Sequence, residues 1–319
     1  MRFKPSEALR FLGGLAAAAF LLGLIALRVT SCAPGPKPIP APPPVASPVP
    51  PSAAPSQPSA PPGAAVSADC AQGPTVAAAA NAASILSLPW APFGRTEAGW
   101  ATYAPLLGRE LRTACPPSSP GFAAALEVWE EAQRLPRDGV LSADDFARLR
   151  GVIQTRRPFV QLSARRVCPD APALDRLELG RPGEGYGGKQ VMLRPAAFAA
   201  WRRMAAAARA ADPRIAADPR YLTIFSGFRD PAADAARCLA EGNCNGIVRA
   251  ACSPHRTGLA VDMYVGQAPG YGPDSSADPN RLFMSRTPAY RWLVANADRF
   301  GFMPYPFEPW HWEWTGEQP

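Results

Sequence analysis

Residues 259–265 form a short, mostly apolar run with an aspartate near its centre. The run reads Leu-Ala-Val-Asp-Met-Tyr-Val, and its length and composition predict a mostly buried strand. A carboxylate such as that of Asp262 is costly inside such a strand unless it is paired or bound to a cation. Any fold of this chain must therefore bring a partner to Asp262.

The candidate partners are His255 and His311, the only two histidines of the chain. Gly258 permits a tight backbone path between His255 and the strand. Residues 310–314 alternate as a strand does, so His311 faces one side and three tryptophans face the other. A catalytic zinc site takes imidazole and carboxylate ligands and keeps one position open for water. We therefore predict that His255, Asp262 and His311 bind zinc.

Glu308 precedes a proline, which biases it towards an extended conformation shortly before His311. As a non-ligand beside the metal, this carboxylate is free to take a proton from the bound water. The alternative is that each histidine is an ordinary surface residue or a satisfied core residue. The aspartate inside an apolar strand favours the metal site.

Four segments in this part of the chain resemble, in order, the motifs of the VanY-type zinc D-alanyl-D-alanine carboxypeptidases. That family belongs to the group that includes lysostaphin-like peptidases and hedgehog domains. The segments are Ser226–Arg229, Ser253–Asp262, Tyr290–Phe302 and Glu308–His311. The resemblance extends over about residues 190–314. Asp234 stands where the family often has a glutamine, which concerns substrate specificity rather than the metal site.

The resemblance implies an enzyme that removes the terminal D-alanine from peptidoglycan stem peptides. Glu308 is then the general base, and Arg229 binds the scissile carbonyl oxygen and stabilises the oxyanion. Ser253 is expected to hold substrate or to orient a ligand, with a turn-capping serine as the alternative. An L,D-carboxypeptidase, an endopeptidase on the same polymer and a non-catalytic wall-binding protein remain alternatives, and Glu308 argues against the last.

The first 66 residues predict an export segment and a tether. Residues 1–32 begin with positive charges and continue into the apolar run 11–27, which predicts a signal peptide or a membrane anchor. Residues 29–32 resemble a bacterial lipobox ending at Cys32. Residues 33–66 are rich in proline and nearly uncharged, which predicts an extended linker. We expect a protein of the bacterial periplasm or cell envelope, membrane-anchored or lipidated.

The rest of the chain is predicted to form two domains. Residues 67–160 predict a small all-α domain, because Phe122, Leu126 and Trp129 form one apolar stripe. This stretch resembles a three-helix peptidoglycan-binding module, and a helical packing domain is the alternative. Residues 161–319 mix helices and strands without regular βαβ alternation, which predicts an α+β zinc peptidase domain with helices packed on an antiparallel sheet.

Individual elements can be predicted within the second domain. A helix that starts near Pro195 and a later helix that stops at Gly301 both have suitable end residues. We expect helices over residues 193–211 and 288–300, a strand over 221–225, and loops over 230–252 and 266–278.

Cysteine content and charge add two further expectations. Six of the seven cysteines remain when Cys32 is set aside, an even number that favours disulfides in an exported chain. We expect Cys70 to pair with Cys115, and Cys238 to pair with Cys244 or Cys252. The net charge of +7 suits an anionic cell wall. The basic residues do not cluster with aromatic residues, so nucleic acid is not expected as a partner. The oligomeric state is left open.

Overall fold

The structure is a computed structural model, and it describes residues 70–91, 94, 97–242, 244 and 252–319. These residues belong to one compact unit, Ala60–Pro319. The predicted export segment, the linker and Cys32 lie outside the described residues. Among the helices that are described, none has the length and apolar character needed to cross a membrane.

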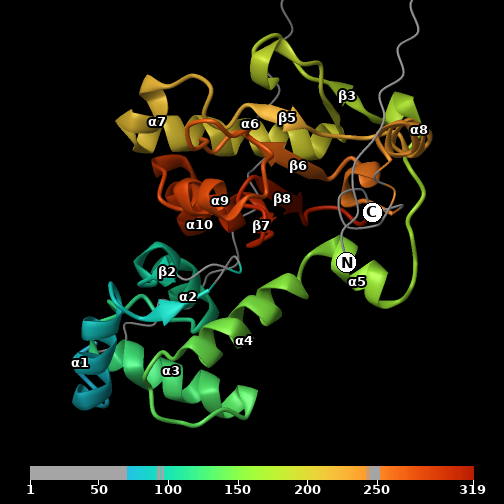
Figure 1. Cartoon of the computed structure of the whole chain (residues 1–319). Coiled ribbons are helices and arrows are strands. Elements are labelled where there is room, and N and C mark those ends of the chain that lie inside the picture. The colour runs from blue at the N-terminus through green and yellow to red at the C-terminus, as the bar shows by residue number, and fades with distance from the viewer. Residues whose placement is uncertain (1–69, 92–93, 95–96, 243, 245–251) are drawn as a thin grey trace, which may run out of the picture. The chain divides into compact units, whose positions relative to one another are not determined.

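The first part of this unit is helical, in agreement with the sequence pattern (Figure 1). Its helices are α1 (Thr75–Ser84), η1 (Ala101–Tyr103), α2 (Ala104–Glu110), α3 (Pro120–Gln133), α4 (Ala143–Gln154) and α5 (Pro158–Ala164). A two-stranded hairpin of β1 (Pro89–Trp90) and β2 (Glu97–Ala98) lies between α1 and η1. The predicted stripe on α3 is buried, and Phe122 stacks on Trp100 with ring centroids 5.9 Å apart.

The turn between α3 and α4 is held by the buried side chain of Asn81. Its Nδ2 donates to the carbonyl oxygen of Gly139 and its Oδ1 accepts from the N–H of Leu141, both at 2.8 Å. Ser142 then caps α4 by accepting from the N–H of Asp145 at 3.1 Å, the arrangement of a capping box. The path of the backbone into α4 is thus fixed by the hydrogen bonds of Asn81 and Ser142.

The second part is built on a four-stranded antiparallel sheet with the order β5-β6-β8-β7. The strands are β5 (Ile224–Ser226), β6 (Ala260–Met263), β7 (Phe302–Pro304) and β8 (His311–Trp314). A separate hairpin of β3 (Glu178–Leu179) and β4 (Met192–Leu193) precedes them. All four residues of β6 are buried. The α+β fold with an antiparallel sheet is therefore confirmed.

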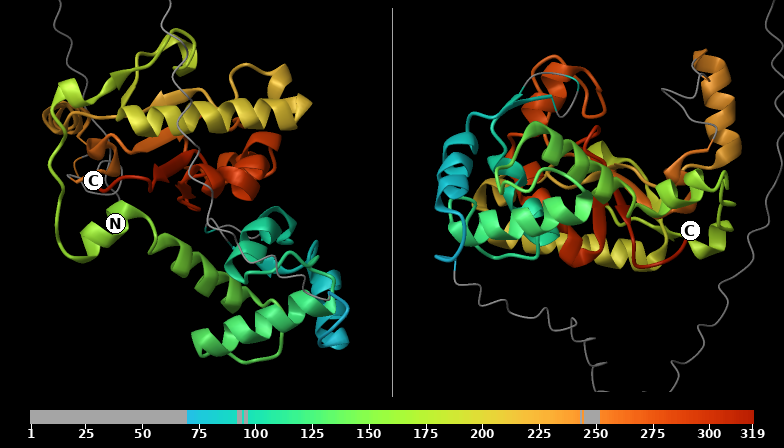
Figure 2. Two further views of the ribbon diagram at one scale, coloured as in Figure 1. Left: turned by 180° about the vertical axis from the view of Figure 1, so that it is seen from behind. Right: turned by 90° about the horizontal axis from the view of Figure 1, so that it is seen from below.

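Helices and 3-10 turns surround this sheet, with α6 running along it in Figures 1 and 2. They are η2 (Leu174–Arg176), η3 (Tyr186–Gly188), α6 (Pro195–Ala211), α7 (Pro213–Ala217), α8 (Pro231–Glu241), η4 (Pro254–Thr257), α9 (Asp278–Met284), α10 (Pro288–Asn296) and η5 (Ala297–Phe300). The predicted helix with Pro195 in its first turn is α6. The helix predicted to stop at Gly301 is α10 followed by η5, and Gly301 has a φ of 84° there.

The strand predicted over 221–225 is wrong at its first residues. The N–H of Thr223 bonds back to the carbonyl oxygen of Arg220 at 3.1 Å. Leu222 takes a φ of 65°, which a strand does not allow. The chain therefore turns first, and β5 begins only at Ile224.

The loop predicted over 230–252 is also wrong in part, because α8 forms within it. Asp230 caps this helix by accepting from the N–H of Ala233 at 2.9 Å, and Gly242 ends it with a φ of 65°. None of the residues of α8 is buried, and the helix projects from the rest of the fold in the right panel of Figure 2.

Three disulfides join described cysteines. Cys70–Cys115 confirms the first predicted pair, and Cys238–Cys244 is one of the two alternatives expected for Cys238. The third bond, Cys168–Cys252, was not predicted. It links the residues that follow α5 to the residue before Ser253, where η4 is capped.

The helical part, from α1 to α5, packs against the sheet part that follows it through shared core residues and partly buried polar contacts. The guanidinium of Arg109 on α2 donates to the carbonyl oxygens of Val294 and Ala295 on α10, at 2.6 and 2.7 Å. Gln154 at the end of α4 donates from Nε2 to the carbonyl oxygen of Pro304 in β7 at 3.1 Å. The two parts thus meet along β7 and α10.

Truncation of Phe198 on α6 tests the packing of this core. The ring is fully buried and lies 5.8 Å from that of Trp201. Phe198→Ala is expected to lower the free energy of unfolding by about 3–5 kcal/mol, through lost burial and the cavity left behind. Val128→Ala, at a 63% exposed position, is the control and is expected to change it by less than about 0.5 kcal/mol. Denaturant unfolding measures both, and equal small effects would contradict the packing described.

Candidate metal centre

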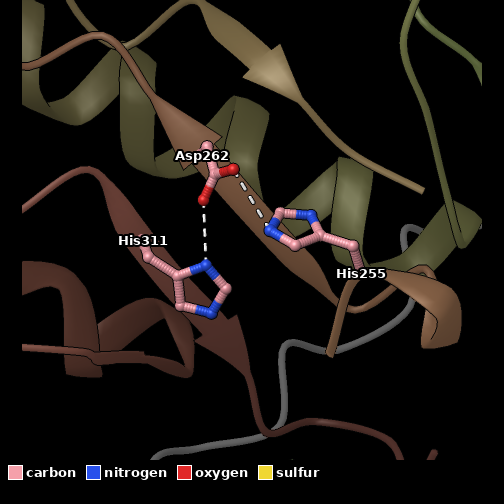
Figure 3. A group of neighbouring side chains, drawn as sticks. All are labelled: His255, Asp262 and His311. Atoms are coloured by element: carbon pink, nitrogen blue, oxygen red, sulfur yellow. Dashed lines mark hydrogen bonds and ion pairs between the residues drawn. The ribbon is translucent and has the colours of Figure 1, made fainter. Parts of the chain in front are cut away.

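The register of β6 on β8 places Asp262 directly opposite His311. Side chains of directly opposed residues share one face of the sheet and lie close enough to interact. Nδ1 of His311 is 2.9 Å from Oδ1 of Asp262 (Figure 3). Both residues are buried, with 3% and 6% of their surface exposed. The pairing of the two predicted strands thus brings two of the three candidate metal ligands, Asp262 and His311, together.

His255 reaches the same carboxylate from η4. Its Nε2 lies 3.1 Å from Oδ2 of Asp262, and its Nδ1 lies 2.8 Å from the carbonyl oxygen of Gly227 (Figure 3 shows the imidazole). Because a carbonyl oxygen can only accept, Nδ1 carries a hydrogen, and in the neutral imidazole Nε2 then keeps its lone pair. This is the tautomer that a metal ligand requires, fixed by a backbone bond.

The donor atoms of His255, Asp262 and His311 all lie within 4.8 Å of one another, so the described residues contain a group that could hold a metal ion. Burial lowers the pKa of the His255 imidazole, and the Asp262 carboxylate only partly opposes this shift. The lowered pKa favours the neutral form of the imidazole, which is the form that binds metals. Burial alone would raise the pKa of Asp262, and the two imidazoles instead hold it well below its usual range. Two imidazoles and an ionised carboxylate fit the ligand set of a divalent ion.

His311 has a second carboxylate beside it. Its Nε2 lies 3.5 Å from Oε1 of Glu313. Burial works against protonation, yet the carboxylates of Asp262 and Glu313 raise the pKa of His311 to about 9. The pKa of Glu313 is lowered to about 2, against burial, by His311 and Arg157. The surroundings of His311 therefore favour a positive charge, whether a proton or a metal ion carries it.

Glu308 lies in the turn that leads into β8. Its N–H donates to the carbonyl oxygen of Tyr305 at 3.0 Å, and its own carbonyl oxygen accepts from the N–H of His311 at 2.9 Å. Burial raises the pKa of the Glu308 carboxyl, and the nearby His311 partly opposes that rise. A carboxylate with a raised pKa is a stronger base than one in water.

Arg229 leaves the end of β5 and is held by two side chains. Its Nη2 donates to Oγ of Ser253 at 2.6 Å, and its Nε lies 3.1 Å from Oδ2 of Asp234. Asp234, the residue that departs from the family pattern, thus pairs with this arginine. Ser253 also accepts from the N–H of His255 at 3.3 Å. The serine therefore caps η4, as the alternative reading proposed, and orients Arg229 as well.

One open cleft of about 970 Å³ contains every residue that sequence analysis singled out for the site. Those residues are Arg229, Ser253, His255, Asp262, Glu308 and His311. The helical part supplies a further set of lining residues, namely Gln154, Arg157, Phe159, Val160, Ser163 and Ala164. The cleft is thus built from residues on both sides of the boundary predicted at residue 160.

Two charged residues beside the candidate metal ligands, Glu313 and Arg157, were not predicted from the sequence. A signal for Glu313 existed, because alternate residues of a strand share a face and Glu313 follows His311 by two positions. Its partner in register on β6 is Ala260. Arg157 carries no local signal, since its partner Glu313 lies 156 residues further along the chain.

The part of the chain that contains this site is similar to a known protein family. Residues 190–317 match the family model VanY, described as D-alanyl-D-alanine carboxypeptidase. The resemblance drawn from the four sequence motifs is therefore confirmed over that range. The resemblance of residues 67–160 to a peptidoglycan-binding module stays a prediction.

No curated protein matches the chain. Among solved structures, one match is a mutant of the vancomycin resistance D,D-pentapeptidase VanY from a VanB-type resistance cassette, in complex with Zn(II). It is 24% identical, and the match covers 46% of this chain and 83% of that chain with a TM-score of 0.28.

Substitution of Gly258 tests whether the tight backbone turn between His255 and β6 is needed to place His255 at the metal site. The φ of Gly258 is 70°, and a Cβ there would lie 2.8 Å from Cδ2 of Leu177 and 3.3 Å from Cγ of Arg194. Gly258→Ala is expected to lose about 1–2 kcal/mol of stability from backbone strain. It is also expected to bind less metal, because η4 must shift to relieve the contacts. Metal analysis and denaturant unfolding provide the measurements.

Gly242 offers a matched control, since it also ends a helix with a positive φ of 65° but has no atom within 4 Å of the place that a Cβ would take. Gly242→Ala is expected to show the backbone strain alone, with the metal content of the wild type. Full metal content in Gly258→Ala would show that the position of His255 does not depend on this glycine.

Proposed function

We propose that this chain is a zinc-dependent cell-wall peptidase that removes the terminal D-alanine from peptidoglycan stem peptides. The observation that carries the proposal is the buried His255–Asp262–His311 group, which shares one cleft with Glu308 and Arg229. All five residues lie within the stretch that matches the D-alanyl-D-alanine carboxypeptidase family. A binding-only site would not need a carboxylate in the position of Glu308.

Zinc is the ion that this donor set favours, because it accepts two imidazoles and a carboxylate and retains an open position. Nε2 of His255, a carboxylate oxygen of Asp262 and Nδ1 of His311 are the atoms that would hold it. When bound, zinc supplies Lewis acidity, which lowers the pKa of water and polarises a carbonyl group.

Glu308 and Arg229 divide the remaining chemistry. The Glu308 carboxylate accepts a proton from the attacking water and passes it to the amine nitrogen as the C–N bond breaks, so that D-alanine leaves neutral at nitrogen. The Arg229 guanidinium, fixed by Ser253 and Asp234, stabilises negative charge that develops on the carbonyl oxygen. Such preorganised donors contribute about 3–4 kcal/mol of transition-state stabilisation in other hydrolases.

We also propose that the protein is exported to the bacterial cell envelope and held there by its N-terminal segment, as a membrane-anchored protein or a lipoprotein. The three disulfides support an oxidising compartment. The positively charged start and the apolar run 11–27 support export. Mass spectrometry of the mature N-terminus from a bacterial host distinguishes cleaved, lipidated and intact forms.

Substitution of Glu308 tests the assignment of the base. A synthetic stem pentapeptide ending in D-Ala-D-Ala is incubated with the purified protein, and free D-alanine is measured. Glu308→Gln is expected to lower the rate by about 10²–10⁴-fold, because the amide cannot accept the proton. Its zinc content is expected to stay at the wild-type level. Glu131→Gln, on the exposed face of α3, serves as the control with an unchanged rate.

The same assay separates the alternatives. Release of D-alanine from a tetrapeptide would identify an L,D-carboxypeptidase, and cleavage of cross-linked muropeptides would identify an endopeptidase. Retention on cell-wall sacculi without hydrolysis would identify a wall-binding protein. A wild-type rate in Glu308→Gln would remove this residue from the mechanism.

Removal of one imidazole tests the metal ligands. His255→Ala is expected to lose both bound zinc and hydrolysis, because two donors hold the ion far more weakly than three. Metal analysis of the purified protein measures the first effect, and Glu308→Gln provides the comparison that keeps zinc without activity. Unchanged zinc in His255→Ala would refute the ligand assignment.

A further inference from the structure

The buried carboxylate beside His311 is paired with an arginine from the helical part of the protein. Arg157 immediately precedes α5 and lies outside the residues that match the carboxypeptidase family. It donates to Oε1 of Glu313 from Nε at 2.9 Å and from Nη2 at 2.5 Å. The N–H of Phe159 donates to Oε2 of Glu313 at 3.2 Å. Only 7% of the Arg157 side chain and 3% of the Glu313 side chain are exposed.

Glu313 faces the side of the His311 imidazole that turns away from Asp262. Its Oε1 is 3.5 Å from Nε2 of His311, while Nδ1 of the same ring faces Asp262. When Nδ1 of His311 binds a metal ion, the hydrogen of the neutral ring must be on Nε2, and Glu313 is the carboxylate beside Nε2 that can accept it. The orientation of the ligand ring therefore depends on where Glu313 is held.

A buried carboxylate in this position needs its own counter-charge. Removal of one partner from a buried ion pair leaves a charge uncompensated, which a protein interior tolerates poorly. The guanidinium that compensates Glu313 is itself fixed on two further sides. Nη1 of Arg157 donates to Oε1 of Gln154 at 2.8 Å, and the guanidinium lies over the ring of Tyr305 with its carbon 4.4 Å from the centroid.

We propose that Arg157 is a positioning residue for the metal centre, acting through Glu313 on the orientation of His311. The residues between α4 and α5 then help to orient a metal ligand, in addition to lining the cleft. This inference rests on the proposed function, since it assumes that the His255–Asp262–His311 group binds zinc. It goes beyond that function because it assigns a role to residues before the family-matched stretch.

The zinc affinity of the full chain tests the proposal. The dissociation constant is measured by competition with a chromophoric chelator, and the zinc-induced rise in melting temperature is measured beside it. Arg157→Met is expected to weaken zinc binding by about 10- to 100-fold, the usual effect of losing an outer partner of a ligand. Arg157→Lys is expected to recover part of the affinity, because an ammonium restores the charge without the two-pronged contact.

Arg109→Met is the matched control. Arg109 also joins the helical part to the sheet part, but through α10. This variant is expected to lower the melting temperature while the zinc dissociation constant and hydrolysis stay at the wild-type values. An equal loss of zinc affinity in Arg109→Met would show that any loosening of the two parts has this effect, and would overturn the proposal.

A double-mutant cycle tests whether Arg157 affects zinc affinity through Glu313. Glu313→Gln alone is expected to weaken zinc binding, and Arg157→Met is expected to add little to it, because the two residues act as one unit. Additive losses would overturn the proposal. Wild-type zinc affinity in folded Arg157→Met would do the same. If Arg157→Met does not fold, the other two variants decide the question. Wild-type zinc affinity in both Arg157→Lys and Glu313→Gln would then overturn the proposal. A wild-type protein that binds no zinc would refute the metal centre itself, which is a separate result.

Discussion

The contact of one buried aspartate with two imidazoles governs the design of this protein. Asp262 sits in the middle strand pair of the sheet, with His311 opposite it in register and His255 arriving from a 3-10 turn. A carboxylate at that depth is stable only while these partners stay in place. The sheet order, the glycine that ends η4 and the turn before β8 all serve to keep three donor groups at one point.

The helical part contributes to the same point from outside the sheet. Its residues share a continuous apolar core with the strands, and its last helices form part of the cleft wall. The pair between Arg157 and Glu313 continues a line of contacts that runs through His311 to Asp262. The contacts around the cleft therefore cross the domain boundary that the sequence pattern predicts at residue 160.

Much of the candidate site could be predicted because its chemistry is local and rare. The chain has two histidines and an aspartate in an apolar strand, so few combinations of donors are available. The antiparallel sheet and α6 followed from residue patterns that act over a few positions. The helix α8 was not predicted, although Asp230 and Gly242 mark its ends, because the stretch with three cysteines was interpreted as loops.

What could not be predicted depends on contacts between distant residues. The bond between Cys168 and Cys252 requires knowledge of which segments become neighbours, and sequence spacing does not supply it. The partnership of Arg157 with Glu313 has the same origin. Both arise where the residues around α5 pass the edge of the cleft. The periodicity of apolar residues predicts single helices and strands. These two contacts depend instead on how the helices and strands pack together.

The Cys168–Cys252 bond has a topological consequence. It turns the backbone from residue 168 to residue 252 into a closed covalent ring, and Arg229 lies within that ring. The residue at its closure adjoins Ser253, which caps the turn of His255 and accepts a bond from Arg229. Arg229 and the turn that carries His255 are consequently both constrained by one disulfide bond. Reduction of this one bond would open the ring and would remove a covalent constraint that both segments share.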